Sequence, residues 1–145
     1  MNRKNIEKMI PVAVEELKRL EKTYPGDKKG IASRYFGYID SFGPTIIQSG
    51  LHQALVFYSE QEEEQDEKKK ADRNSIVKII KNILSSGGYL NGPNVSQKLV
   101  DLVPQDIYQK MTFKNRILEA IIACKLAMKL FKRIRPEDEK KAESV

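Results

Sequence analysis

Cysteine, histidine and tryptophan are scarce in this chain. Its 145 residues include one cysteine, one histidine and no tryptophan. Because Cys124 is alone, the chain cannot form an internal disulfide, and its apolar neighbours predict a small buried side chain rather than a reactive thiol. Because His52 is alone, no histidine pair exists for a zinc site, and its place beside Leu51 favours a structural imidazole. The lack of disulfides suits a reducing compartment, so we expect the protein in the cytoplasm.

Membrane segments and nucleotide-binding motifs are also lacking. No run approaches the roughly 18 apolar residues of a membrane span, and the apolar stretch at 10–14 is too short for a signal peptide. Gly87-Gly88 is not followed by the Lys-Ser/Thr of a phosphate-binding loop. The acids at 60–67 lie in a charge-mixed segment that would not hold carboxylates in fixed geometry. We therefore expect no catalytic residues, no cofactor, no metal site and no membrane contact.

Helical periodicity dominates what is present, and strand signals are nearly absent. The apolar spacing predicts a first helix up to Tyr24, a second from Ile31 to Phe42 and a third from Pro44. It also predicts a fourth helix from Asn74 to Ser86 and a short one after Asn94. A long last helix is predicted from a cap at Thr112 to about Arg135. The expected fold class is all-α, a single-domain bundle of about five to seven helices over residues 1–136 with a long C-terminal helix. Residues 59–73 are expected to form a charged linker, either an exposed loop or a frayed helical extension, and residues 137–145 a disordered tail.

The segment from Tyr35 to Tyr58 is punctuated like a corner between two helices. Gly43-Pro44 predicts a break, because the residue before a proline is pushed out of the α region while proline is tolerated at a first helical position. Gly50 then interrupts the apolar stripe of the helix predicted from Pro44, and this glycine predicts close backbone contact there.

This corner resembles the small-subunit protein of the type III-B (Cmr) CRISPR RNA-guided effector complex. The matching elements are Phe42, Gly43-Pro44, Ile46-Ile47, Ser49-Gly50-Leu51 and Ala54-Leu55-Val56-Phe57, with Tyr108, Thr112 and Lys132-Arg133 near the other end. The resemblance implies a structural role in the motif for Pro44, Gly50, Leu51 and Phe57. Gly43, Ser49 and the missing tryptophan depart from the family pattern.

The same resemblance implies a function. Family members are non-catalytic subunits that stack along guide RNA and target RNA in an antiviral defence complex, so the expected partners are these RNAs, other subunits and further copies of the chain. Cleavage and cyclic-nucleotide synthesis belong to other subunits of such complexes.

Positive charge is concentrated in the predicted last helix. Residues 112–135 hold seven Lys or Arg and one acid. The net charge of this segment is therefore +6, equal to the net charge of the whole chain. At about 100° per residue, four lysines fall within roughly a 60° arc with an arginine beside them, forming a basic ridge suited to RNA phosphates. The ridge consists of Lys114, Lys125, Lys129, Lys132 and Arg133.

A second basic group lies on the predicted first helix, at Lys18, Arg19 and Lys22, with Lys28, Lys29 and Arg34 beyond its turn. Four tyrosines could stack unpaired bases, but their helical spacing predicts core positions: Tyr35, Tyr38, Tyr58 and Tyr108. The alternative to RNA binding is a helical protein–protein adaptor in which the lysines are a solvated face that confers solubility.

Overall fold

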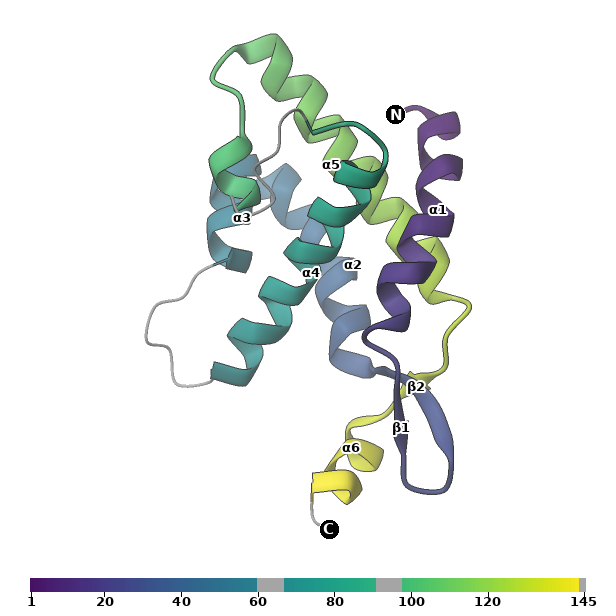
Figure 1. Ribbon diagram of the computed structural model, residues 1–145. Coiled ribbons are helices and arrows are strands. Elements are labelled where there is room, and N and C mark those ends of the chain that lie inside the picture. The colour runs from purple at the N-terminus through teal and green to yellow at the C-terminus, as the bar shows by residue number, and fades with distance from the viewer. Residues whose placement is uncertain (60–66, 91–97, 144–145) are drawn as a thin grey trace.

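The computed structural model describes residues 1–59, 67–90 and 98–143 of the chain. In chain order these residues form α1 (Arg3–Lys18), β1 (Lys22–Tyr24), β2 (Lys28–Ala32), α2 (Ser33–Ser49), α3 (Leu51–Ser59), α4 (Glu67–Ser86), the 3-10 turn η1 (Leu99–Leu102), α5 (Ile107–Met128), β3 (Arg133–Ile134) and α6 (Pro136–Glu143). Helices dominate and α5 is the longest, which confirms the all-α class and the long helix late in the chain (Figure 1). None of the described helices is long and apolar enough to cross a membrane.

Helix α5 is the centre of the hydrophobic core. Its middle lies near the start of α1, where the Asn2 backbone N–H donates to Glu119 Oε1 at 3.2 Å, and its C-terminal end lies near the end of α1. The two helices therefore run in the same direction, as Figure 1 shows. Met9, Ala13 and Leu17 repeat every fourth residue along α1 and are buried there. Burial of one such large apolar side chain contributes about 1.5–3 kcal/mol, so this face holds α1 in place.

Helix α2 runs through the expected corner without a break. It includes Pro44 and ends at Ser49, before Gly50, whose φ of 91° is a conformation that side chains disfavour. The predicted break at Gly43-Pro44 is wrong, because glycine has no Cβ for the proline ring to clash with and Pro44 is exposed. The close contact predicted at Gly50 is also wrong, since a Cβ there would meet nothing within 4 Å. Gly50 is required for its φ, and the next helix starts at Leu51.

A small sheet replaces the expected ends of two helices. β1 and β2 form an antiparallel hairpin in which Thr23 faces Lys29, with Gly26 at φ 82° and Asp27 at φ 57° in the turn. Helix α1 thus ends at Lys18 rather than Tyr24, and Ile31 lies on a strand rather than at the start of a helix.

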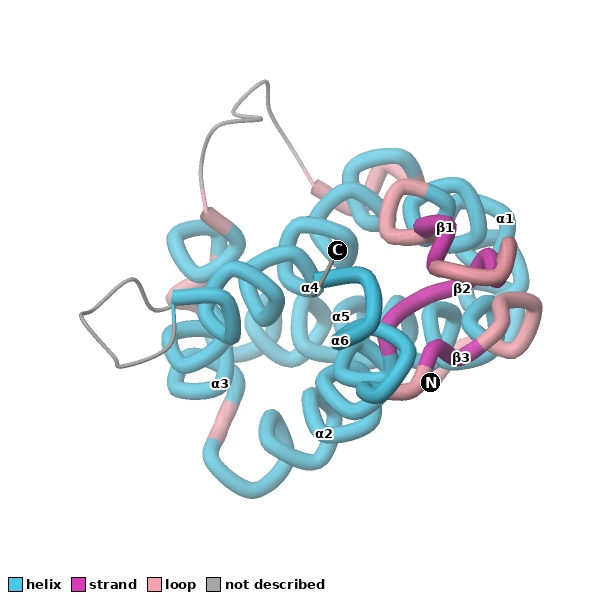
Figure 2. The backbone as a smooth tube through the Cα atoms, turned by 90° about the horizontal axis from the view of Figure 1, so that it is seen from below, coloured by secondary structure: helices cyan, strands magenta, loops and turns pink. Residues whose placement is uncertain are grey.

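The third strand returns from the far end of the chain. β3 pairs in parallel with β2, with Ile31 opposite Arg133, and the Ile31 N–H donates to the Lys132 carbonyl at 2.8 Å. A Cβ on Gly30 would lie 2.3 Å from that carbonyl, so glycine permits this approach. Helix α5 consequently ends at Met128, and its predicted extension to about Arg135 is wrong. Figure 2 shows the three strands together at one end of the molecule.

The remaining boundaries agree in part with expectation. Helix α4 ends before Gly87-Gly88 as predicted, with Gly88 at φ 75°, but it starts at Glu67, so the second half of the expected linker at 59–73 is helical. Helix α5 is capped by Asp106, which accepts from the Gln109 N–H at 3.0 Å, and not by Thr112. Residues 60–66 and 91–97, with the expected cap at Asn94, lie outside the described residues. In place of a disordered tail, residues 136–143 form α6, which starts with a proline and three acids as helix N-termini favour.

Candidate nucleic-acid interface

Positive charge gathers at the end of the molecule that carries the strands. We call this region the sheet end and define it as residues 18–34 and 125–140. Residues 18–34 hold six Lys or Arg against two acids, and residues 125–140 hold six against three. Figure 1 shows that the C-terminal ends of α1 and α5 both lie on the side of the molecule that carries the hairpin and α6. Because helix C-termini carry partial negative charge, they stabilise neighbouring cations.

The predicted group of Lys18, Arg19 and Lys22 is divided between two elements. Lys18 ends α1 and its Nζ lies 2.9 Å from Glu15 Oε1, while Arg19 follows the helix with Nη1 3.2 Å from Glu16 Oε2. Lys22 is exposed on β1. The three cations remain at the sheet end, but they do not share one helical face.

The predicted basic ridge is also divided. Lys114 and Lys125 are half-buried on α5, and Lys129 is the exposed residue that caps the helix. Lys132 and Arg133 follow the turn, so a ridge continuing along one helix is wrong. The Arg133 Nε donates to Ser33 Oγ at 3.0 Å, and its guanidinium lies 5.2 Å from the centre of the Phe36 ring.

A surface hollow of about 630 Å³ lies between Lys18 of the first basic group and the turn after α5. Its walls come from α1, the hairpin and the turn after α5: Val14, Lys18, Glu21, Lys29, Leu130 and Phe131. Lys29 faces its counter-ion Glu21 at 3.6 Å. The sequence showed Lys28 and Lys29 near the first group, but only the hairpin places Lys29 beside the turn after α5. The Pro25-Gly26-Asp27 segment was the signal for such a hairpin.

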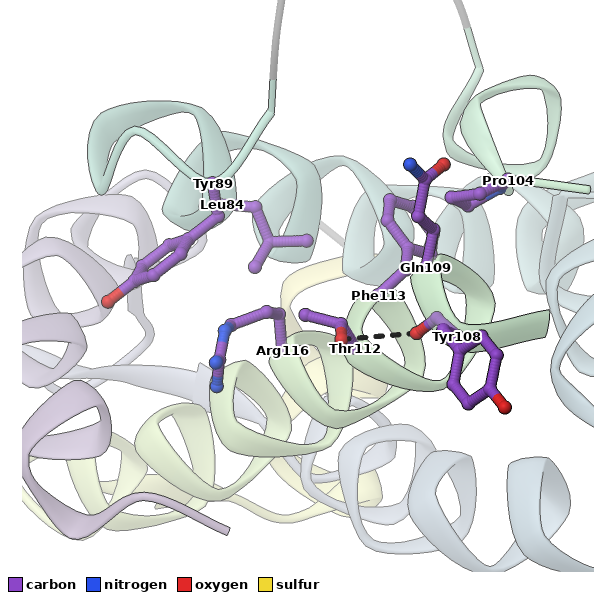
Figure 3. A pocket seen from close by; sticks show the side chains of 8 residues that line it. All are labelled: Leu84, Tyr89, Pro104, Tyr108, Gln109, Thr112, Phe113 and Arg116. Atoms are coloured by element: carbon purple, nitrogen blue, oxygen red, sulfur yellow. Dashed lines mark hydrogen bonds between the residues drawn. The ribbon is translucent and has the colours of Figure 1, made fainter. Parts of the chain in front are cut away.

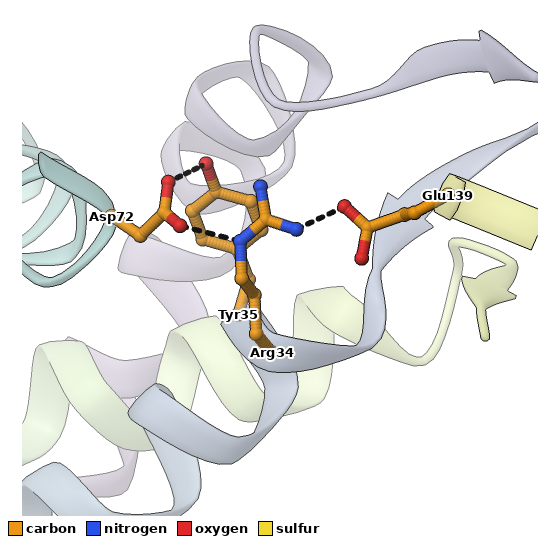
Figure 4. Close-up of polar contacts among 4 residues, drawn as sticks. All are labelled: Arg34, Tyr35, Asp72 and Glu139. Atoms are coloured by element: carbon orange, nitrogen blue, oxygen red, sulfur yellow. Dashed lines mark hydrogen bonds and ion pairs between the residues drawn. The ribbon is translucent and has the colours of Figure 1, made fainter. Parts of the chain in front are cut away.

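Arg34 lies at the edge of the sheet end in a network of four residues (Figure 4). Its Nε donates to Asp72 Oδ2 on α4, its Nη1 donates to Glu139 Oε1 on α6, and its guanidinium lies 5.0 Å from the centre of the Tyr35 ring. The Tyr35 hydroxyl donates to Asp72 Oδ1 at 2.8 Å. Burial would lower the pKa of Arg34, but hydrogen bonds to Glu139 and Asp72 outweigh burial and raise it. Burial and the bond to Asp72 raise the pKa of Tyr35 to about 12.

The opposite end of α5 is apolar and exposed. Every residue from 107 to 112 is exposed, and we call this segment the overhang. It presents Ile107, Tyr108 and Met111, which are 66%, 78% and 58% exposed. Tyr108 was expected in the core with Tyr35, Tyr38 and Tyr58. Tyr35 and Tyr58 are buried and Tyr38 is partly buried, but Tyr108 is exposed, because α5 starts earlier than predicted and its first turns project beyond the bundle.

A hollow of about 440 Å³ lies beside the overhang (Figure 3). Its walls are Leu84, Tyr89, Pro104, Tyr108, Gln109, Thr112, Phe113 and Arg116. The Tyr108 ring turns outward from it, whereas the Thr112 Oγ1 donates back to the Tyr108 carbonyl at 3.2 Å. Arg116 Nη1 pairs at 2.6 Å with the buried carboxylate of Glu119. This hollow therefore combines apolar walls with a cation that already has a counter-ion.

The motif residues have different surroundings. Leu51 is buried at the start of α3, whereas Phe57 is 46% exposed, lying edge-on to Tyr58 at 5.6 Å and under the Arg73 guanidinium at 4.7 Å. His52 is exposed on α3, and the described residues contain no group of three or more potential metal ligands. Cys124 is fully buried as predicted, and burial, with the nearby Glu16 charge, raises the pKa of its thiol to about 12.

Comparison with known proteins gives one match. Residues 7–129 match the family described as CRISPR-associated protein (Cas_Cmr5). No curated protein and no solved structure matches the chain. The matched range includes the motif around Pro44 and Gly50 and ends at Lys129, so β3 and α6 lie beyond it.

Proposed function

Because the chain belongs to the Cas_Cmr5 family and is therefore a small subunit of the type III-B (Cmr) CRISPR complex, we propose that it lies along guide and target RNA and binds their backbone electrostatically. In this role the protein supplies no catalytic group. Base pairing between guide and target provides sequence selection, while protein subunits provide a positive surface that recognises backbone and shape.

The observation that supports this proposal is the concentration of cations at the sheet end. Each phosphate neutralised by a lysine or arginine releases counterions, which adds affinity that does not depend on sequence. The proposed contacts are Lys18, Arg19, Lys22, Lys125, Lys129, Lys132 and Arg133, with Lys114 farther along α5. Lys18 lines the hollow that α1, the hairpin and the turn after α5 form, and Lys129 and Lys132 flank its Leu130 and Phe131 in the sequence.

A triple substitution tests the proposal. Lys22→Ala, Lys129→Ala and Lys132→Ala remove three exposed cations of the sheet end, and the matched control replaces Lys4, Lys8 and Lys98, which are exposed elsewhere. RNA binding by the first variant should weaken for all sequences alike. The logarithmic salt slope should become shallower by roughly 2 to 2.7, from about 0.7 to 0.9 for each lost phosphate contact. Equal losses in both variants would contradict a localised surface.

The adaptor function is supported by a different observation, the apolar overhang at residues 107–112. Three large apolar side chains on two exposed turns are typical of a protein contact. Within a multisubunit complex, this contact can coexist with RNA binding at the sheet end. If the triple variant joins the complex normally and its RNA affinity and salt slope equal those of the unchanged protein, the adaptor function alone is supported.

A further inference from the structure

The guanidinium of Arg34 is fixed in one orientation by its neighbours. Asp72 accepts from Nε on one edge, and the Tyr35 ring lies against one face of the plane. Tyr35 in turn fixes Asp72 by donating to its other carboxylate oxygen at 2.8 Å. Figure 4 shows that these contacts leave Nη1 directed toward Glu139 of α6. A planar guanidinium held in this way matches the geometry of carboxylate or phosphate oxygens.

In this structure a carboxylate takes that position. Glu139 of α6 accepts from Arg34 Nη1, and the preceding Asp138 lies 3.4 Å from Lys28 Nζ on the hairpin. Two consecutive acids of α6 thus occupy two cations of the sheet end. Lys28 and Arg34 have side chains 43% and 25% exposed even with α6 in place.

The attachment of α6 depends on charge rather than on apolar burial. Among the α6 side chains that the structure describes, at residues 136–140, none is buried. The Lys28–Asp138 pair is partly exposed, and such a pair contributes little stability and weakens with salt. A polyanion with many phosphates can therefore compete with these two carboxylates for the same cations.

We propose that Arg34 and Lys28 form a phosphate-binding fork for the RNA backbone, and that the acids of α6 occupy this fork until RNA displaces them. This inference rests on the proposed RNA binding at the sheet end and adds two residues and a regulatory segment to it. Helix α6 acts as an intramolecular competitor that lowers RNA affinity. Asp72 and Tyr35 are positioning residues, because they hold the guanidinium and do not touch the phosphate.

The first test removes the competing charges. Asp138→Asn and Glu139→Gln eliminate the two contacting carboxylates, while the control, Glu7→Gln with Asp101→Asn, makes the same charge change at exposed positions outside the sheet end. Binding of a fluorescent poly(U) RNA is measured across a salt series. The first variant should bind on the order of tenfold more tightly at 0.1 M salt, because RNA no longer has to displace two carboxylates, and this advantage should shrink as salt weakens the ion pairs of the unchanged chain. A change no larger than that of the control overturns the inference.

The second test observes displacement in a chain whose acids are intact. A nitroxide is attached at Lys140→Cys, an exposed position of α6, and the native Cys124 is fully buried and so escapes labelling. Addition of poly(U) should narrow the nitroxide spectrum, because α6 leaves the fork and moves more freely. An unchanged or broader spectrum contradicts displacement. Equal narrowing by inorganic phosphate at the same phosphate concentration would assign the fork to free phosphate and overturn the RNA assignment.

Failure of this inference differs from failure of the proposed function. If the Lys22, Lys129 and Lys132 substitutions weaken RNA binding while the α6 substitutions do not strengthen it, the sheet end binds RNA and the fork is wrong. If neither set changes RNA affinity beyond its control, RNA binding at the sheet end is itself wrong, and the fork fails with it.

Discussion

The two ends of α5 present opposite surfaces to their surroundings. At its C-terminal end the sheet end gathers lysines and arginines around three strands, and its acids already neutralise some of them. At its N-terminal end the overhang exposes Ile107, Tyr108 and Met111. A cationic surface suits a polyanion, and an exposed apolar surface suits a protein. Helix α5 separates the two kinds of surface.

The largest predicted effect concerns the reactivity of the Cys124 thiol, which is buried in the core between the overhang and the sheet end. Burial raises the pKa of the Cys124 thiol from its ordinary value of 9.0 to about 12, so at pH 8 the folded chain should hold about a thousandfold less thiolate than the unfolded chain. Alkylation by iodoacetamide should be correspondingly slow and should become fast in urea. Because the raised pKa favours the neutral thiol, its contribution to stability is present below pH 9 and is lost as the pH rises toward 12. Rapid alkylation of the folded chain would show that the core opens between the two ends.

The next largest effect should be confined to the sheet end. Gly30→Ala places a Cβ 2.3 Å from the Lys132 carbonyl, so β2 and β3 must separate, at a cost of about 3 kcal/mol in the free energy of unfolding. The control is Gly37→Ala on α2, where a Cβ meets nothing within 4 Å and alanine should stabilise the helix by about 0.5–1 kcal/mol. Urea unfolding measures both. A Gly30→Ala variant as stable as the unchanged chain would contradict the pairing of β2 with β3.

Much of the helical core could be predicted from the sequence, and the sheet end could not. The apolar spacing of Met9, Ala13 and Leu17 and the glycines after Ser86 are local signals, and the structure has the corresponding buried face and helix end. Strands of two to five residues are too short to show a period, and β3 exists because it pairs with a strand about a hundred residues earlier. The ridge after Met128 was misplaced for this reason.

The candidate site also combines features with a local sequence signal and features that depend on long-range contacts. The sequence identified the cations at Lys18, Lys129 and Lys132, since charge is visible without a fold. It gave no indication that Glu139 would meet Arg34, because that contact joins residues 105 positions apart. The resemblance to the Cmr small subunit depended on the local motif around Pro44 and Gly50, and the family match confirms it, although the helix break expected there is wrong.

A smaller effect should distinguish the overhang from the sheet end. Tyr108→Ser with Met111→Ser should weaken association with the companion subunits by about tenfold, or about 1.4 kcal/mol, and should leave the RNA salt slope unchanged. The folded chain should lose little stability because both side chains are exposed. Titration of the labelled variant into complex that lacks this subunit provides the measurement. The control is Leu130→Ser, an apolar residue 73% exposed at the sheet end. A larger loss from Leu130→Ser would reverse the assignment of the two ends.

The smallest effect concerns the middle of the molecule, where neither surface should respond. Pro44 lies inside α2 without a backbone N–H to donate, and its side chain is exposed. Pro44→Ala restores a donor and replaces a poor helix former by the best one, while the unfolded chain gains freedom that offsets part of the benefit. We expect the free energy of unfolding to rise by about 1 kcal/mol in urea unfolding, with RNA affinity and subunit association both unchanged. A loss of stability would instead show that Pro44 sets the path of α2 toward Gly50, and a change at either end would show that the two surfaces communicate through this helix.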